Sequence, residues 1–331
     1  MSNKHDLIYY CDSYPAIGNG HLKRGLDIVH QLLKIKPTLN LALAGKFSES
    51  GWHFLQRLKP DRVGVYKNKI PAQKFKIGIL DTIYPGDAST IPEERCRDLN
   101  EISDEVIAFN TGIKTFIPDC VDGIINYIPV TEYTGNQDVK KFFGVEYAPV
   151  GPSFKPGNTK FNKRILCIIG GNQQQYGPER LCQQLKSLLS PDYKVDFILS
   201  PHFPENKAKY LINKYTAINF HQNLKSVVEY VENSQCVITT YGNATWEALT
   251  MHKPVFIVSY LDFQKFFASY LAEKGYAVDL GYLKDLNVSK LSLLMDDQMQ
   301  QELIKSIRKK FKAPGIINIT NLLLEELDVS H

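Results

Sequence analysis

The chain has 331 residues, of which 44% are hydrophobic and 22% are charged, and its formal net charge is +4. This composition is typical of a folded globular protein and excludes a disordered or strongly basic chain, so the overall charge gives no support for nucleic-acid binding. A peripheral contact with a membrane surface stays open, because local basic patches can form from Lys34, Lys36, Lys305, Arg308, Lys309, Lys310 and Lys312.

The sequence gives no sign of a membrane span or of a bound metal. No apolar run approaches the ~20 residues that cross a bilayer, and the N-terminus lacks a secretory-signal pattern, so we expect a cytoplasmic protein. The six cysteines lack metal-ligand spacing, and we expect reduced, mostly buried thiols. No Asp-x-Asp pair is present. The sequence therefore implies neither a metal nor a cofactor.

The first half of the chain alternates β-rich runs with helical patterns, which predicts a parallel sheet covered by helices. Residues 110–160 are richer in turn formers, and we place the end of an N-terminal Rossmann-like domain within them, so that it spans residues 1–155. The expected strands are 6–11, 39–44, 63–66, 77–81 and 105–109, and the expected helices are 21–35 and one through 54–55.

The same alternation starts again in the second half, which predicts a second Rossmann-like domain over residues 156–331. Its last helix, about 299–327, is interrupted at Pro314 and able to pack back on the N-terminal domain. The other expected elements are strands 164–169, 195–199, 236–240 and 255–258, helices 179–189, 205–215 and 224–233, and a helix after Gln264. The predicted fold class is α/β, with two parallel-sheet domains facing each other across a cleft.

A glycine-rich turn follows the first expected strand and contains Gly18, Asn19, Gly20 and His21. Small residues let the backbone approach a ligand closely, and the free N–H groups of the following helix favour negative charge. His21 can then meet a phosphate or an incoming hydroxyl, and Asp12 can orient His21 or bind a substrate hydroxyl. The alternative is that the glycines only make a tight connection and that His21 is an ordinary residue at a helix N-terminus.

A second glycine turn follows strand 164–169 and contains Gly171, Asn172 and Gln173. Its backbone N–H groups can form an anion site, and the two side chains add donors. The alternative is a tight strand-to-helix connection with an exposed glutamine run.

A third turn follows strand 236–240, and its residues point to a nucleotide subsite. The carboxylate of Glu247 can accept both hydroxyls of a ribose, or it can cap the helix in its first turn. Asn243 or Thr245 can also cap that helix. Gln264, at the next strand-to-helix turn, can read sugar hydroxyls. The residues assigned to this subsite are Gly242, Asn243, Ala244, Thr245, Glu247 and Gln264.

These motifs, taken in order, resemble the two-domain GT-B nucleotide-sugar enzymes. The resemblance is strongest to the group that contains the UDP-sugar hydrolase of pseudaminic acid biosynthesis and the spore-coat polysaccharide glycosyltransferases. It is collinear over roughly residues 6–285 and rests on 11–13, 17–24, 80–81, 145–152, 170–171, 241–247 and 262–264.

The resemblance implies a UDP-type donor held mainly by the C-terminal domain, with Glu247 on the ribose and the 242–245 turn on the diphosphate. It also implies that His21 acts at the anomeric carbon as a general base and that Asp81 lies at the donor site. Lys23 or Arg24 would supply a cation for the leaving diphosphate in place of a metal. His21 and Glu247 would therefore have to meet on one donor.

The chain departs from the hydrolase group at two places. Thr82 stands where that group usually has a histidine, and Tyr241-Gly242-Asn243 replaces a Gly-Gly-Ser turn. We therefore predict a metal-independent glycosyltransferase that uses a nucleotide-activated sugar and a hydroxyl acceptor. A hydrolase that directs water to the same carbon is the alternative, and an inactive nucleotide-sugar-binding protein is an alternative of another class.

Overall fold

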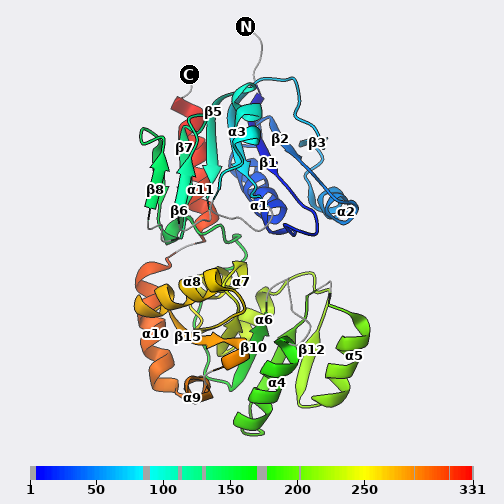
Figure 1. Cartoon of the computed structure of the whole chain (residues 1–331), viewed down its shortest axis with the longest axis vertical. Helices are drawn as coiled ribbons and strands as arrows, with labels where there is room; N and C mark the ends of the chain where they lie inside the picture. The colour runs from blue at the N-terminus through cyan, green and yellow to red at the C-terminus, as the bar shows by residue number, and fades with distance from the viewer. Residues whose placement is uncertain are drawn as a thin grey trace. The chain divides into compact units, whose positions relative to one another are not determined.

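The computed structural model describes residues 5–84, 90–110, 114–128, 132–169, 177–200, 203–286, 288–312 and 314–329. The chain forms two compact units (Figure 1). The N-terminal unit comprises Met1–Pro152 and Pro314–His331, and the C-terminal unit comprises Ser153–Ala313. The first change of unit lies close to the expected boundary after residue 155, and the last segment of the chain returns to the N-terminal unit.

The N-terminal unit is built on a parallel sheet with the strand order β3-β2-β1-β4-β5-β7-β9 in the described residues. Its strands are β1 (His5–Cys11), β2 (Leu41–Gly45), β3 (Gly64–Lys67), β4 (Phe75–Asp81), β5 (Ser103–Phe109), β7 (Gly123–Asn126) and β9 (Lys140–Phe143). A separate parallel pair consists of β6 (Lys114–Ile117) and β8 (Glu132–Gly135). The helices are α1 (Gly20–Ile35), α2 (Glu49–Leu58), α3 (Glu93–Asn100), the 3₁₀ turn η1 (Val145–Tyr147) and α11 (Gly315–Val329).

The five strands expected in this half are present, whereas β6 to β9 lie in the stretch that the sequence indicated only as rich in turns. Each of these four strands has four residues. A strand of that length spans two alternations of side chains, which is too short for a pattern of period two to stand out.

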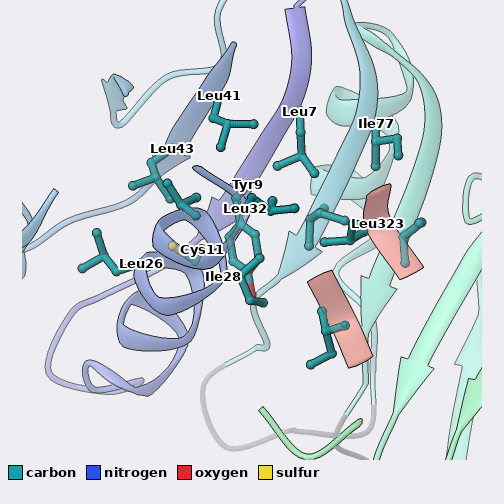
Figure 2. Packing of buried hydrophobic residues seen from close by; sticks show 14 of the residues in the cluster. Leu7, Tyr9, Cys11, Leu26, Ile28, Leu32, Leu41, Leu43, Ile77 and Leu323 are labelled. Atoms are coloured by element: carbon teal, nitrogen blue, oxygen red, sulfur yellow. The ribbon is translucent and has the colours of Figure 1, made fainter. Parts of the chain in front are cut away.

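Alternate residues of β1 pack into two different hydrophobic cores. Leu7 and Tyr9 pack with Leu32 of α1, whereas Ile8 and Tyr10 belong to a cluster that includes Leu99 of α3. Figure 2 shows Leu7 and Tyr9 together with side chains from α1 and with Leu323 of α11. Because successive side chains of a strand point to opposite faces, β1 is buried on both sides, as expected for a central parallel strand.

Helix α11 completes the first of these cores, although it is far from β1 in the sequence. Ile316, Ile319 and Leu323 are fully buried in it. A Cβ atom at Gly315 would lie 2.7 Å from the carbonyl oxygen of Glu146 and still closer to that of Ala148, so a glycine permits this approach of α11 to η1. The predicted interruption at Pro314 thus separates two helices that belong to different units.

The C-terminal unit contains a second parallel sheet, with the order β12-β11-β10-β13-β14-β15 in the described residues. Its strands are β10 (Arg164–Ile168), β11 (Lys194–Ile198), β12 (Ile218–His221), β13 (Cys236–Thr239), β14 (Val255–Ser259) and β15 (Ala277–Tyr282). Its helices are α4 (Gly177–Leu188), α5 (Glu205–Lys214), α6 (Val228–Asn233), α7 (Asn243–Thr250), α8 (Asp262–Glu273), α9 (Val288–Leu291) and α10 (Asp297–Lys310), with 3₁₀ turns η2 (Leu283–Asp285) and η3 (Ser292–Met295).

Both sheets share one topology, because the strand order reverses beside the first strand of each unit. The reversal lies between β1 and β4 in the N-terminal unit and between β10 and β13 in the C-terminal unit. Ligands of open parallel sheets bind outside the carboxyl ends of the strands at such a reversal. We therefore expect a ligand site at the loops that follow these four strands.

Two further observations concern the cysteines and the hydropathy of the helices. All six cysteines are free, and all but Cys120 are buried. Within the described ranges, none of the helices combines the length and the apolar character that a membrane span requires.

The turn between α7 and β14 buries a lysine, which predicts a measurable pH dependence of stability. Lys253 is 2% exposed and donates to the carbonyl oxygens of Glu232 and Ser234, both at 2.8 Å. Burial lowers the pKa of its ammonium from 10.5 to about 8. Between these two values the unfolded chain binds the extra proton, so this lysine makes the free energy of unfolding rise as pH increases.

We therefore expect the free energy of unfolding of the wild type, relative to Lys253→Met, to increase by about 2 kcal/mol between about pH 7.5 and about pH 9.5. Urea unfolding of both proteins at the two pH values measures this difference, and the comparison cancels the titration of all other groups. Parallel pH profiles for the two proteins would contradict the prediction.

Candidate active site

His21 is positioned by the turn that joins β1 to α1. Helix α1 begins at Gly20, so His21 lies in its first turn. Gly18 has a φ of +80°, which favours glycine, and its N–H donates to the carbonyl of Tyr14 at 2.8 Å. The hydroxyl of Ser13 donates to Oδ1 of Asn19 at 2.6 Å, and Asn19 makes no side-chain cap of the helix. The turn is thus held by its own contacts, and it directs His21 towards the end of β4.

At that end lies a buried carboxylate, Asp81, which is 1% exposed. It receives four contacts: Oδ2 accepts from Nε of Arg24 at 2.6 Å and from the hydroxyl of Tyr9 at 2.5 Å, and Oδ1 lies 2.7 Å from Nδ1 of His21 and accepts from Nη2 of Arg24. Nη1 of Arg24 also donates to the hydroxyl of Tyr127 at 3.2 Å. We call His21, Arg24, Asp81 and Tyr9 the Asp81 cluster.

The charges in this cluster are mutually stabilising. Burial by itself would raise the pKa of the Asp81 carboxyl, but the charge of Arg24 and the contact with His21 outweigh burial and hold that pKa well below its usual range. Burial likewise works against the charge of Arg24, and Asp81 more than compensates, so that the pKa of Arg24 is raised. Asp81 is therefore ionised and Arg24 charged throughout the neutral range.

An ionised Asp81 fixes the tautomer of His21. A carboxylate only accepts hydrogen bonds, so the 2.7 Å contact requires the proton of the neutral ring to reside on Nδ1. Nη2 of Arg24, 3.0 Å from the same Nδ1, is then a neighbouring donor and not a partner. Nε2 keeps its lone pair, and among the described residues nothing is hydrogen-bonded to it. A histidine held in this way by a carboxylate is equipped to accept a proton at Nε2.

The structure brings Arg24 and Asp81 together, whereas sequence reasoning placed both at the donor as separate residues. Arg24 is 6% exposed and turned into the cluster. Asp12 does not contact His21: its carboxylate accepts from the N–H of Lys46 at 2.7 Å and from the hydroxyl of Thr82 at 2.8 Å. Asp81, and not Asp12, orients His21. No sequence signal favoured Asp81 over Asp12, because the strand order that puts the end of β4 beside β1, with Cys11 and Asp81 in register, is known only from the structure.

In the C-terminal unit, the turn after β13 leads into α7. Gly242 occupies the N-cap position in an extended conformation, and a glycine has no side chain that could cap the helix. Thr245 is fully buried, and its hydroxyl donates to the carbonyl of Thr240 at 3.1 Å, so this side chain fastens the turn. Asn243 is exposed, and Gly242 and Ala244 are half-buried. Among the described residues, neither Asn243 nor Thr245 therefore caps α7 as expected.

Glu247 lies one turn further along α7 than expected. The helix starts at Asn243, and its first turn contains no acidic residue. The interpretation of Glu247 as a first-turn cap is therefore wrong, because the helix begins too early for it. Its side chain is half-buried.

Gln264 lies in the first turn of α8, after β14. Its Oε1 accepts from the N–H groups of Tyr260 at 2.8 Å and Leu261 at 3.4 Å, so one end of the amide stabilises the start of the helix. The predicted anion site of Gly171, Asn172 and Gln173 lies outside the described residues. Within the described part of the chain, no group of three or more His, Cys, Asp or Glu side chains is placed to hold a metal ion.

Comparison with known proteins adds two weak sequence relatives, and no protein-family profile matches the chain. The chain is 23% identical over 288 residues to the UDP-2,4-diacetamido-2,4,6-trideoxy-beta-L-altropyranose hydrolase of Campylobacter jejuni, a match that covers 83% of this chain and 99% of the hydrolase. It is 22% identical over 277 residues to the uncharacterized protein MJ1062 of Methanocaldococcus jannaschii, covering 77% of this chain and only 55% of that protein.

Solved structures show a closer likeness in fold. The calicheamicin glycosyltransferase CalG4 matches with a TM-score of 0.64 at 10% identity, over 98% of both chains. A UDP-glucose:anthocyanidin 3-O-glucosyltransferase, solved in complex with UDP, matches with a TM-score of 0.62 at 11% identity, over 99% of this chain and 100% of that one. The chain has the GT-B fold. The GT-B assignment confirms the predicted α/β class with two Rossmann-like domains, and the hydrolase match agrees with the predicted resemblance.

Proposed function

We propose that this GT-B protein is a metal-independent glycosyltransferase that uses a nucleoside diphosphate sugar, in the first place a UDP-sugar, with His21 as the general base. The observation that carries the proposal is the contact of 2.7 Å between Nδ1 of His21 and the ionised Asp81 at the carboxyl ends of β1 and β4. This contact leaves Nε2 as a proton acceptor at the place where parallel sheets bind their ligands.

In the proposed reaction, the oxygen of an acceptor hydroxyl forms a bond to the anomeric carbon of the donor. The bond from that carbon to the diphosphate oxygen breaks, and its electron pair leaves with the nucleoside diphosphate. The proton of the hydroxyl moves to Nε2 of His21. The negative charge of Asp81 stabilises the imidazolium that results, as carboxylates do in other histidine-carboxylate pairs.

For the donor, we propose that the turn after β13 provides the nucleotide subsite. Backbone N–H groups of Gly242, Asn243 and Ala244 would face the diphosphate, and Glu247 would accept the ribose hydroxyls. Support comes from the position of this turn beside the strand-order reversal of the second sheet. Thr245 holds the turn in shape. Arg24 is buried, so we propose that it neutralises Asp81 and does not contact the diphosphate directly.

Hydrolysis of the same donor is the second candidate, and one observation favours it. The match to the Campylobacter hydrolase extends over 99% of that enzyme. In that reaction water would take the place of the acceptor hydroxyl, and its proton would go to the same Nε2. Against hydrolysis stands Thr82, which replaces the histidine usual in the hydrolase group and whose hydroxyl donates a hydrogen bond to Asp12.

A donor screen tests the proposal and separates the two candidates. The protein is incubated with UDP-, dTDP-, GDP- and CMP-sugars, first alone and then with a panel of hydroxyl acceptors, and mass spectrometry follows nucleotide and sugar products. A transferase shows slow release without acceptor and a new glycoside with one. Rapid release of nucleotide and free sugar without acceptor would replace the transferase by the hydrolase. Binding of a donor without any turnover would reject both.

A further inference from the structure

Two segments of the C-terminal unit carry cations without any acidic residue. Residues 153–164 and residues 303–312 contain no Asp or Glu. Their basic residues are Lys155, Lys160, Lys163, Arg164, Lys305, Arg308, Lys309, Lys310 and Lys312. In a chain whose net charge is only +4, this is a local concentration of positive charge.

Contacts between side chains and backbone bring the two segments together. Nη2 of Arg308, in the last turn of α10, donates to Oδ1 of Asn158 at 2.8 Å. The hydroxyl of Thr159 donates to the carbonyl of His252 at 2.9 Å, and Nε2 of His252 donates to the carbonyl of Phe311 at 2.7 Å. The segment around Asn158 therefore lies against the end of α10, with the turn at His252 joining them.

Some of these cations are already neutralised and others are not. Lys163 pairs with Asp192, Lys305 with Glu302, and Arg164 with Asp196. No carboxylate among the described residues pairs with the exposed cations Lys155, Lys160, Arg308, Lys309 and Lys312. We call these five residues the basic surface. Lys160 is also close enough to the buried Lys253 for its charge to oppose that of Lys253, after the larger effect of burial.

We propose that the basic surface docks the protein on an anionic lipid surface. Clusters of four to eight Lys and Arg side chains are attracted to the phosphate groups of acidic lipids over about one Debye length. This inference goes beyond the proposed function and does not depend on it.

The aromatic residues of the two segments favour a lipid surface over a nucleic acid. Sites for single-stranded nucleic acid combine cations with several exposed aromatic rings, on which successive bases stack. Here Phe154 and Phe311 are both 4% exposed, and Phe161, next to Lys160, is 38% exposed. One exposed ring beside cations suits the boundary between lipid headgroups and acyl chains, where aromatic side chains are accommodated.

Vesicle co-sedimentation of the full chain tests this docking. The vesicles are an equimolar mixture of phosphatidylglycerol and phosphatidylcholine, with pure phosphatidylcholine as the neutral reference, at low and at high salt. We expect binding only to the mixed vesicles, lost at high salt, and weakened at least about tenfold by Lys309→Glu/Lys312→Glu. The matched control, Lys186→Glu/Lys209→Glu, changes the net charge equally on α4 and α5 of the same unit and should bind as the wild type does.

Three results would overturn the proposal: no binding of the wild type to the mixed vesicles, equal binding to both vesicle types, or equal loss in the two double variants. A poly(U) oligonucleotide provides the remaining comparison. Tighter binding to it than to the mixed vesicles, abolished by Lys309→Glu/Lys312→Glu, would assign the surface to nucleic acid instead.

All four positions are exposed, and thermal unfolding by circular dichroism verifies that each variant is folded. None of these readouts involves donor turnover, so failure here leaves the proposed function untouched.

Discussion

His21→Ala is expected to reduce turnover of the nucleotide-sugar donor by about 10²–10⁴-fold, because it removes the proton acceptor at Nε2. Donor binding, measured by calorimetry, should change little, since the proposed nucleotide subsite lies in the other unit. The activity assay is the donor screen described above, carried out with the best donor and acceptor.

His30→Ala is the matched control for this variant. His30 lies on the same helix α1, is exposed, and its ring contacts only the carbonyl of Leu26 at 2.9 Å among the described residues. It should retain wild-type turnover. Unchanged turnover in His21→Ala would remove His21 from the mechanism, and equal losses in both variants would point to damage of the helix.

Asp81→Asn is expected to lower both turnover and stability. An amide can donate to Nδ1 and so favour the tautomer with the proton on Nε2, and in a serine protease the same exchange costs about 10⁴-fold in rate. The variant also leaves Arg24 charged and buried without a counter-charge, which typically destabilises a protein by about 3–5 kcal/mol. Steady-state kinetics and urea unfolding measure the two effects.

A second substitution separates these two effects. Asp81→Asn/Arg24→Gln removes both charges, so most of the lost stability should return while turnover stays low. Recovery of turnover together with stability would show that Asp81 acts only through folding. Tyr9→Phe offers a milder reference, because it removes one hydrogen bond to Asp81 and leaves both charges in place.

Local patterns predicted the elements that matter most for the site. The apolar runs that became β1, β4, β10 and β13 are long enough to identify as buried strands, and glycines mark the turns that follow three of them. Their hydrophobic character and the turn residues are properties of neighbouring positions, so they can be read directly along the chain. The short strands β6 to β9 were not predicted, because four residues contain too few alternations of apolar and polar side chains.

The sequence named residues for the proposed site without showing which of them contact one another. Arg24 and Asp81 were both placed at the donor, and the structure pairs them with each other. Asp12 and Asp81 each follow or end a strand beside the reversal, and the sequence alone offers no reason to prefer Asp81 as the partner of His21. Glu247 was misplaced by one helical turn, since a helix start is among the least certain features of a sequence pattern.

The sequence by itself determined the α/β class, two Rossmann-like halves and a histidine on a glycine-rich turn, because each depends on periodicity or turn chemistry within a few residues. Only the tertiary structure decided which carboxylate holds that histidine and on which nitrogen its proton lies. Asp81 is separated from His21 by 60 positions, from Arg24 by 57 and from Tyr9 by 72. Contacts over such separations follow from strand order and burial, which bring one charged arginine and one carboxylate into the same water-poor space, where each requires the other.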